Sequence, residues 1–88
     1  MNLEMAKEIL HAVEAQPNGV LRIRGRKMRH EAELMREAGW LELATASGAH
    51  WWLTARATAA GHRISDLFRK EAIAQRLRDA FTPPIPEL

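Results

Sequence analysis

The sequence predicts a small α+β domain of three helices and a two- or three-stranded antiparallel sheet. Residues 3–15 and 26–38 repeat apolar side chains at the spacing of amphipathic helices, and residues 59–81 carry two such stripes. Residues 40–43 and 50–57 alternate apolar and polar side chains, which is typical of half-buried strands. The 88 residues include no cysteine, so one compact core must hold the fold without disulfides or thiolate-bound zinc.

The first predicted helix has clear signals at both ends. Asn2 is suited to cap it, and Glu4 suits the positive end of the helix dipole. Pro17 cannot continue the helix, and the Asn18-Gly19 pair after it favours a turn. The apolar stripe that we expect to be buried consists of Leu3, Ala6, Ile9, Leu10 and Val13.

Residues 20–24 predict a short strand, because Leu21 and Ile23 alternate with Val20, Arg22 and Arg24. Such a strand could add to the later hairpin and complete a three-stranded sheet. Gly25 then interrupts the run.

The second helix, residues 26–38, has an unusual charge order. Arg26, Lys27 and Arg29 open it, and its glutamates come later, although a helix dipole favours acids at the start. This unfavourable order predicts an anionic partner at the start of the helix. Gly39 is placed to end it, and the face that we expect to be buried carries Met28, Ala32, Met35 and Ala38, with Leu34 beside them.

The predicted hairpin, with its turn at residues 45–49, contains all three tryptophans. Trp40 is expected in the core. Trp51 and Trp52 are neighbours on a strand, so they point to opposite faces and one of them reaches the surface. We expect Trp52 either to form a partner surface or to lie over Arg56 or the final helix.

The last helix is predicted to start after Thr58, with Thr54 as the alternative cap, and to run to about Phe81. Its first apolar stripe comprises Ile64, Leu67 and Phe68. The second comprises Ile73, Ala74, Leu77 and Phe81, rotated by roughly 120° from the first. Either a homodimer buries the second stripe, or the helix bends at residues 69–71. Domain 1–82 would be followed by a proline-rich tail, residues 83–88.

The stretch 34–41, followed by a hairpin and by Thr58-Ala59-Ala60-Gly61-His62-Arg63-Ile64, resembles the winged-helix DNA-binding domains of small bacterial regulators such as the MarR-like and PadR-like groups. The resemblance implies a winged-helix-like fold that reads DNA with a helix and a β-wing. Winged helices have two helices between the first helix and the wing, whereas residues 16–38 have room for one helix and a short strand. Either residues 20–25 hide a one-turn helix, or the helix-turn-helix is shortened. Some shortened winged helices of phages and mobile elements bind other proteins.

The charges predict where a nucleic acid would bind. No acidic residue lies between Glu14 and Glu31, nor between Glu42 and Asp66. If these two intervals meet in space, they form the positive patch expected of a phosphate-binding surface. The candidate nucleic-acid-binding residues are Arg22, Arg24, Arg26, Lys27, Arg29, His30 and Arg56.

Other functional classes have little support in the sequence. His11, His30, His50 and His62 lack metal-ligand spacing, and no nucleophile or phosphate-loop motif appears, so we expect no metal, cofactor or catalytic centre. No apolar run approaches the ~20 residues of a membrane span, which favours a cytoplasmic protein.

We therefore expect a regulator that binds double-stranded DNA. The alternative is an adaptor or inhibitor that presents the tryptophan hairpin and basic face to an acidic protein, and a weaker third hypothesis is a dimerisation module. The candidate partner or dimer interface is Trp52, Ile73, Leu77 and Phe81.

Overall fold

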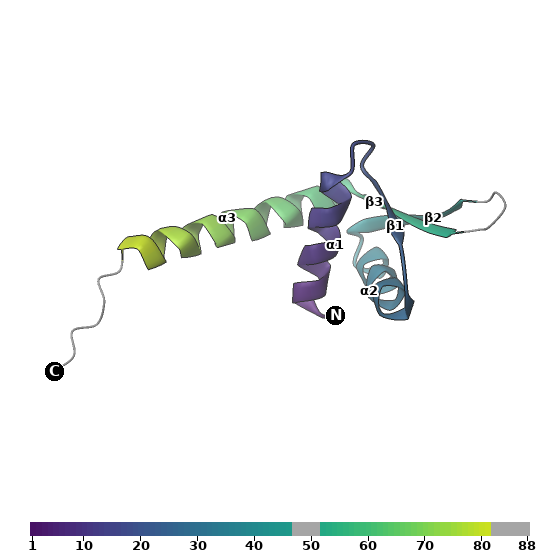
Figure 1. The fold of residues 1–88 in the computed structure, drawn as a ribbon, viewed down its shortest axis with the longest axis horizontal. Helices are drawn as coiled ribbons and strands as arrows, with labels where there is room; N and C mark the ends of the chain where they lie inside the picture. Colours follow the sequence, from purple (N-terminus) through teal and green to yellow (C-terminus); the bar gives the residue numbers. More distant parts are fainter. Residues whose placement is uncertain (47–51, 82–88) are drawn as a thin grey trace.

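The computed structural model describes residues 1–46 and 52–81. Helices α1 and α2 pack against one face of the sheet, and α3 extends away from it (Figure 1). The chain is thus a small α+β domain with a β-wing formed by β2 and β3, as the sequence predicts. In chain order the elements are α1 (Leu3–Ala15), β1 (Val20–Ile23), α2 (Arg26–Glu37), β2 (Leu41–Ala46), β3 (Trp52–Ala57) and α3 (Ala59–Phe81).

The sheet is antiparallel, with the strand order β1-β3-β2. Arg22 of β1 lies opposite Thr54 of β3, and Glu42 of β2 lies opposite Arg56. Residues 20–23 are therefore a third strand, and no one-turn helix lies between α1 and α2. The predicted turn begins at Thr45, but Thr45 and Ala46 pair with β3 and belong to β2. The rest of that turn and Trp51 lie in residues 47–51, outside the described part of the chain.

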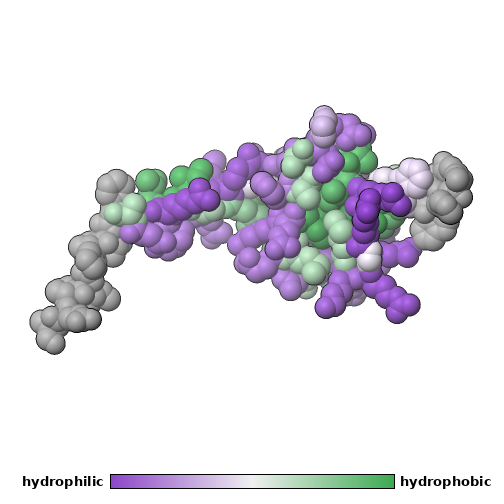
Figure 2. Space-filling view, viewed as in Figure 1, coloured by the Kyte–Doolittle hydropathy of each residue, from purple (hydrophilic) through white to green (hydrophobic). Residues whose placement is uncertain are grey.

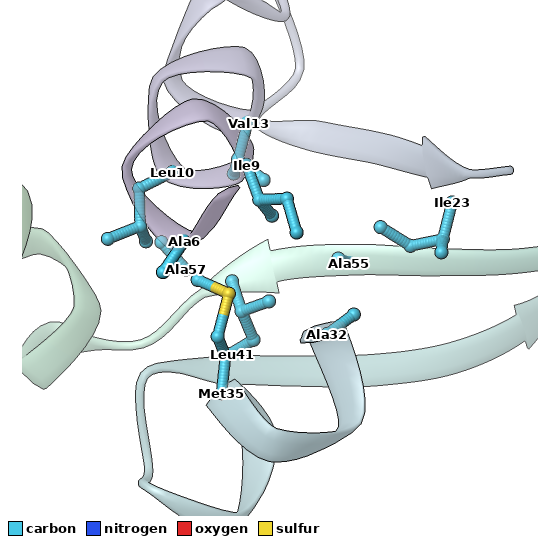
Figure 3. Packing of buried hydrophobic residues seen from close by; sticks show 10 residues of the cluster. All are labelled: Ala6, Ile9, Leu10, Val13, Ile23, Ala32, Met35, Leu41, Ala55 and Ala57. Carbon is cyan, nitrogen blue, oxygen red and sulfur yellow. The ribbon is translucent and has the colours of Figure 1, made fainter. Parts of the chain in front are cut away.

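The core lies between one face of the sheet, which we call the inner face, and helices α1 and α2 (Figure 3). Period-two alternation places Ile23, Leu41 and Ala55 on the inner face, whereas Arg22 and Arg56 face outward and are exposed. Each fully buried aliphatic side chain contributes roughly 1.5–3 kcal/mol. The buried cluster consists of Ala6, Ile9, Leu10, Val13, Ile23, Ala32, Met35, Leu41, Ala55 and Ala57.

The predicted ends of α1 and α2 are confirmed. The Asn2 side chain accepts a hydrogen bond from the Met5 N–H at 3.2 Å. After α2, Gly39 has φ 83°, a conformation that glycine adopts without strain. The Gly39 N–H then donates to the Arg36 carbonyl and the Trp40 N–H to the Met35 carbonyl, both at 2.9 Å. This pair of bonds is a Schellman motif, which satisfies the last carbonyls of α2.

Two predictions of burial in α1 and α2 are wrong, and one buried residue was not foreseen. Ala38 is exposed because it is the cap residue where α2 ends. Leu3 is 54% exposed at the open end of α1. Glu31, in contrast, is only 5% exposed. Its carboxylate accepts a hydrogen bond from the Asn2 backbone N–H at 2.7 Å, so it joins α2 to the start of α1.

A joint formed by Gly39, Trp40, Thr58 and Gly61 attaches α3 to the rest of the domain. Thr58 caps α3, as the sequence predicts: its hydroxyl oxygen accepts a hydrogen bond from the Gly61 N–H at 3.0 Å. The same hydroxyl donates to the Gly39 carbonyl, and the Thr58 N–H donates to the Trp40 carbonyl at 3.0 Å. A Cβ at Gly61 would overlap the Trp40 carbonyl oxygen, so only glycine fits there.

Helix α3 runs as one α-helix from Ala59 to Phe81, so residues 69–71, where one of the two alternatives placed a bend, continue the helix without a break. Ile64 and Phe68 pack against the core, and the Phe68 ring meets Trp40 edge-on at a centroid distance of 6.4 Å. Leu67, predicted to share that stripe, is instead 58% exposed. None of the helices in the described ranges has both the length and the apolar character needed to span a membrane.

Candidate nucleic-acid interface

One corner of the domain collects arginines from β1 and α2. Strand β1 ends at Ile23, and the chain turns at Gly25, whose φ of 82° and ψ of 160° are open essentially to glycine alone. Helix α2 begins at the next residue. Hydrophilic surface lies at the corner where β1 meets α2 (Figure 2). We call this the arginine corner, and it consists of Arg22, Arg24, Arg26 and Arg29.

The arginine corner surrounds a hollow of about 360 Å³. Trp52 of β3 joins its wall, and the backbone turn at Gly25 closes one side. The Arg22 guanidinium carbon lies 5.2 Å from the centroid of the Trp52 ring, which is a cation–π distance. Half-buried Trp52 therefore contacts Arg22, and not Arg56 or the final helix as one sequence hypothesis held.

The positive charge of the corner is only weakly compensated. Arg29 Nε lies 3.8 Å from Glu33 Oε1, and both side chains are about half exposed, so the pair contributes at most about 1 kcal/mol. Within residues 1–46 and 52–81, no ion pair involves Arg22, Arg24 or Arg26. The first turn of α2 has no acidic residue, and its N-terminal dipole adds to the positive potential.

Two of the three acidic residues of α1, Glu4 and Glu14, make contacts away from the corner, and the third, Glu8, lines a hollow beside Met28 of α2. Glu14 Oε2 accepts from Arg69 Nη2 of α3 at 2.6 Å, and the other oxygen, Oε1, lies 3.4 Å from His62 Nδ1. Glu4 pairs with Lys7 at 3.6 Å on the same helix. These contacts tie α1 to α3 and stabilise α1 itself.

The structure brings four of the seven candidate nucleic-acid-binding residues together around the hollow. Lys27 and His30 are exposed on α2 but do not line it. Arg56 lies on the outer face of the sheet, where it lines a separate, smaller hollow of about 220 Å³ beside Glu42. Arg56 does not line the hollow of the arginine corner, and strand pairing brings the acidic Glu42 opposite it.

The candidate interface residues divide between two regions. Trp52 belongs to the arginine corner, whereas Ile73 and Leu77 lie on the projecting part of α3 and are 54% and 53% exposed. Hydrophobic atoms are visible on this part of α3, at the left of Figure 2. Phe81 is the last residue of the helix, and its side chain is outside the described residues.

Sequence reasoning missed an apolar hollow of about 410 Å³ between α1 and α3. Trp40, Ile64, Phe68 and Glu71 line it together with Leu3 and Leu67, the two leucines that were expected in the core. The α3 residues that line it are the whole first stripe and Glu71, so the sequence identified the apolar face but not that a neighbour leaves part of it uncovered.

No family model, curated protein or solved structure matches this chain. Within the described ranges, no three histidine, aspartate or glutamate side chains gather as a possible metal-ligand set.

Proposed function

We propose that the protein is a regulator of the winged-helix type that binds double-stranded DNA through the arginine corner. The convergence of Arg22, Arg24, Arg26 and Arg29 on one hollow carries this proposal. Planar guanidinium groups match phosphate oxygens in pairs and also match the guanine edge, so such a cluster suits a DNA backbone and its grooves.

The geometry supports a mechanism dominated by phosphate contacts. A single helix separates β1 from the wing, so the duplex would meet the first turn of α2 rather than a full helix-turn-helix. Lys27 and His30 extend the contact along the exposed side of α2, and Arg56 approaches the neighbouring backbone from the sheet. Contacts of this kind set orientation and affinity, and a few base contacts add sequence preference.

The test reverses charge at the corner. The Arg26→Glu/Arg29→Glu variant should bind a random duplex at least about 100-fold more weakly at about 50 mM salt, because several phosphate contacts are lost and replaced by repulsion. Fluorescence anisotropy of a labelled duplex measures this loss. Arg36→Glu/Arg76→Glu changes net charge equally at two exposed sites away from the corner, and should retain most of the affinity.

If both double variants bind DNA like the unmodified protein, the arginine corner is not a DNA site. The adaptor hypothesis would then be preferred, with the arginine corner and Trp52 facing an acidic protein. An adaptor would leave the duplex mobile in a gel and would co-purify with a protein that the Arg26→Glu/Arg29→Glu variant releases.

We further propose that two copies pair through the projecting half of α3. From Ala72 to Ala80 every residue except Ala74 is exposed, including Ile73 and Leu77. A helical segment of this length is marginal in water unless an apolar face is packed. A second copy would cover the second stripe and extend the cover to Leu67.

Charge favours an antiparallel arrangement of the two helices. Glu71 and Arg78 lie on the same edge of the stripe, about 20° apart around the axis at ~100° per residue. Antiparallel helices would bring Glu71 of one copy beside Arg78 of the other, whereas parallel helices would bring Glu71 toward Asp66. The expected dimer is therefore antiparallel.

Solution mass tests this pairing. The unmodified protein should approach twice the 10.0 kDa mass of the chain as concentration rises, because burial of the stripe drives association. Leu77→Glu should stay monomeric, since it puts a charge into the stripe. Ala72→Glu adds the same charge on the opposite side of α3 and should still dimerise. A mass of one chain at all concentrations by analytical ultracentrifugation contradicts the dimer.

A further inference from the structure

We infer that the arginine corner also receives an unpaired nucleobase, stacked against Trp52, so that the preferred nucleic acid carries a single-stranded segment. This inference rests on the proposed nucleic-acid binding and names the chemical class of the ligand more narrowly. The observation behind it is an indole set among four arginines on the open side of the sheet.

Trp52 lies at the end of the sheet, where β3 begins, and outside the hydrophobic core. Pairing between β1 and β3 ends at Ile23 and Leu53, so β1 leaves the sheet just where Trp52 begins β3. Trp52 alternates with Leu53 and shares the outer face with Thr54 and Arg56, opposite the buried Ala55. The fold thus places a large aromatic ring at the rim of a basic hollow, outside the buried cluster.

The chemistry of this hollow suits a base better than a backbone alone. Proteins that bind single strands combine a positively charged groove with aromatic rings, because every base offers a π-face. In a duplex that face is covered by the neighbouring base pairs, so the Trp52 ring can stack only on a base that is unpaired and turned out of a helix. Arg22 already stacks near the indole and can sandwich a base, while Arg24 and Arg26 are placed for the adjoining phosphates.

A purely structural role for the Arg22–Trp52 contact makes a different prediction. A structural contact would stabilise the hairpin, so its loss would weaken every nucleic acid equally by disturbing the corner. A stacking role would weaken the ligand with unpaired bases and spare the duplex. Selectivity between the two ligands therefore separates the two roles.

The experiment compares a labelled oligothymidylate of about 15 nucleotides with a duplex of equal length, both titrated by anisotropy at about 50 mM salt. Trp52→Ala should weaken oligothymidylate binding by about 5- to 100-fold, the range for loss of one base stack, and duplex binding by less than about 2-fold. Trp52→Phe should recover most of the loss because it restores a ring. Thr54→Ala, on the same outer face, is the matched control and should leave both affinities unchanged. An oligouridylate arm shows whether the single strand can be RNA.

The outcomes separate this inference from the proposed function. Equal losses on both ligands, or no loss on the single strand, overturn the stacking role. Neither result contradicts the proposal that the unmodified protein binds duplex DNA. Selective loss on the single strand with Trp52→Ala, rescued by Trp52→Phe, supports the stacking role even if duplex binding is weak. If the unmodified protein binds neither ligand, the proposed function and this inference both fail.

Discussion

The joint at the base of α3 and the arginine corner are both conspicuous in the sequence, but they differ in what the structure does with them. In the joint, Thr58 makes two hydrogen bonds to the Gly39-Trp40 turn and caps α3 through a third, and Gly61 approaches the Trp40 backbone closely. At the arginine corner, Arg24 and Arg26 stay exposed around a hollow. The polar groups of the joint form hydrogen bonds within the protein, whereas the side chains of Arg24 and Arg26 are exposed to solvent.

This difference shows which sequence features concern fold and which concern function. The phrase around Gly39 and the phrase from Thr58 to Gly61, which carry the winged-helix resemblance, are explained by packing and capping alone. They require no ligand. Arg24 and Arg26 lack such an explanation, because both are exposed, no ion pair involves either of them within the described ranges, and Arg26 opposes the dipole of α2. Variants in the two regions should therefore fail in opposite ways.

The largest effect is expected from Gly61→Ala. Alanine in a helix would by itself add about 1 kcal/mol to the free energy of unfolding. The new Cβ would instead collide with the Trp40 carbonyl and push α3 off the sheet. We expect a net loss of about 3 kcal/mol, which lowers the Tm of a domain of this size by more than about 10 °C. Thermal unfolding followed by circular dichroism measures the change.

The sign of the change in the free energy of unfolding decides between the two effects of Gly61→Ala. A stabilising Gly61→Ala would mean that helix propensity outweighs the collision, so that the joint can open. In that case the resemblance phrases would no longer be accounted for by packing, and the contrast between the two regions would disappear.

Much of the fold could be read from the sequence because its signals are local. Apolar spacing, the Asn2 and Thr58 caps and the glycine at position 39 define helix ends within one residue or two. The alternation in residues 20–23 correctly predicted a third strand. Each of these signals acts within a few residues of the chain, so no tertiary information is needed to recognise it.

The errors at Glu31 and Leu67 concern which element lies opposite a residue. Glu31 is buried where its carboxylate accepts a hydrogen bond from the backbone N–H of Asn2, the cap residue of α1, a contact across 29 positions of sequence. Leu67 is exposed because the packing of Ile64 and Phe68 sets the rotation of α3. Periodicity identifies an apolar face but does not say how much of that face a neighbour covers.

The candidate site was only partly predictable for the same reason. Arg22, Arg24, Arg26 and Arg29 are near in sequence, and a single turn at Gly25 brings them together. Arg56 comes from another strand, and its surroundings depend on the register that places Glu42 opposite it. Trp52 was recognised as a surface residue, but its place among the arginines depends on the point where β1 leaves the sheet.

The smallest effect on stability, and the sharpest contrast with Gly61→Ala, is expected from Arg24→Ala/Arg26→Ala. Both side chains are exposed, and no ion pair involves either of them within the described ranges, so the free energy of unfolding should change by less than about 0.5 kcal/mol. Duplex binding should weaken across all sequences, and the slope of log affinity against log salt should fall by about two, one for each lost phosphate contact. Chemical denaturation and salt-dependent anisotropy give the two quantities on the same samples. A variant that unfolds more easily and keeps its salt slope would place these arginines with the joint, as part of the fold rather than of a DNA-binding surface.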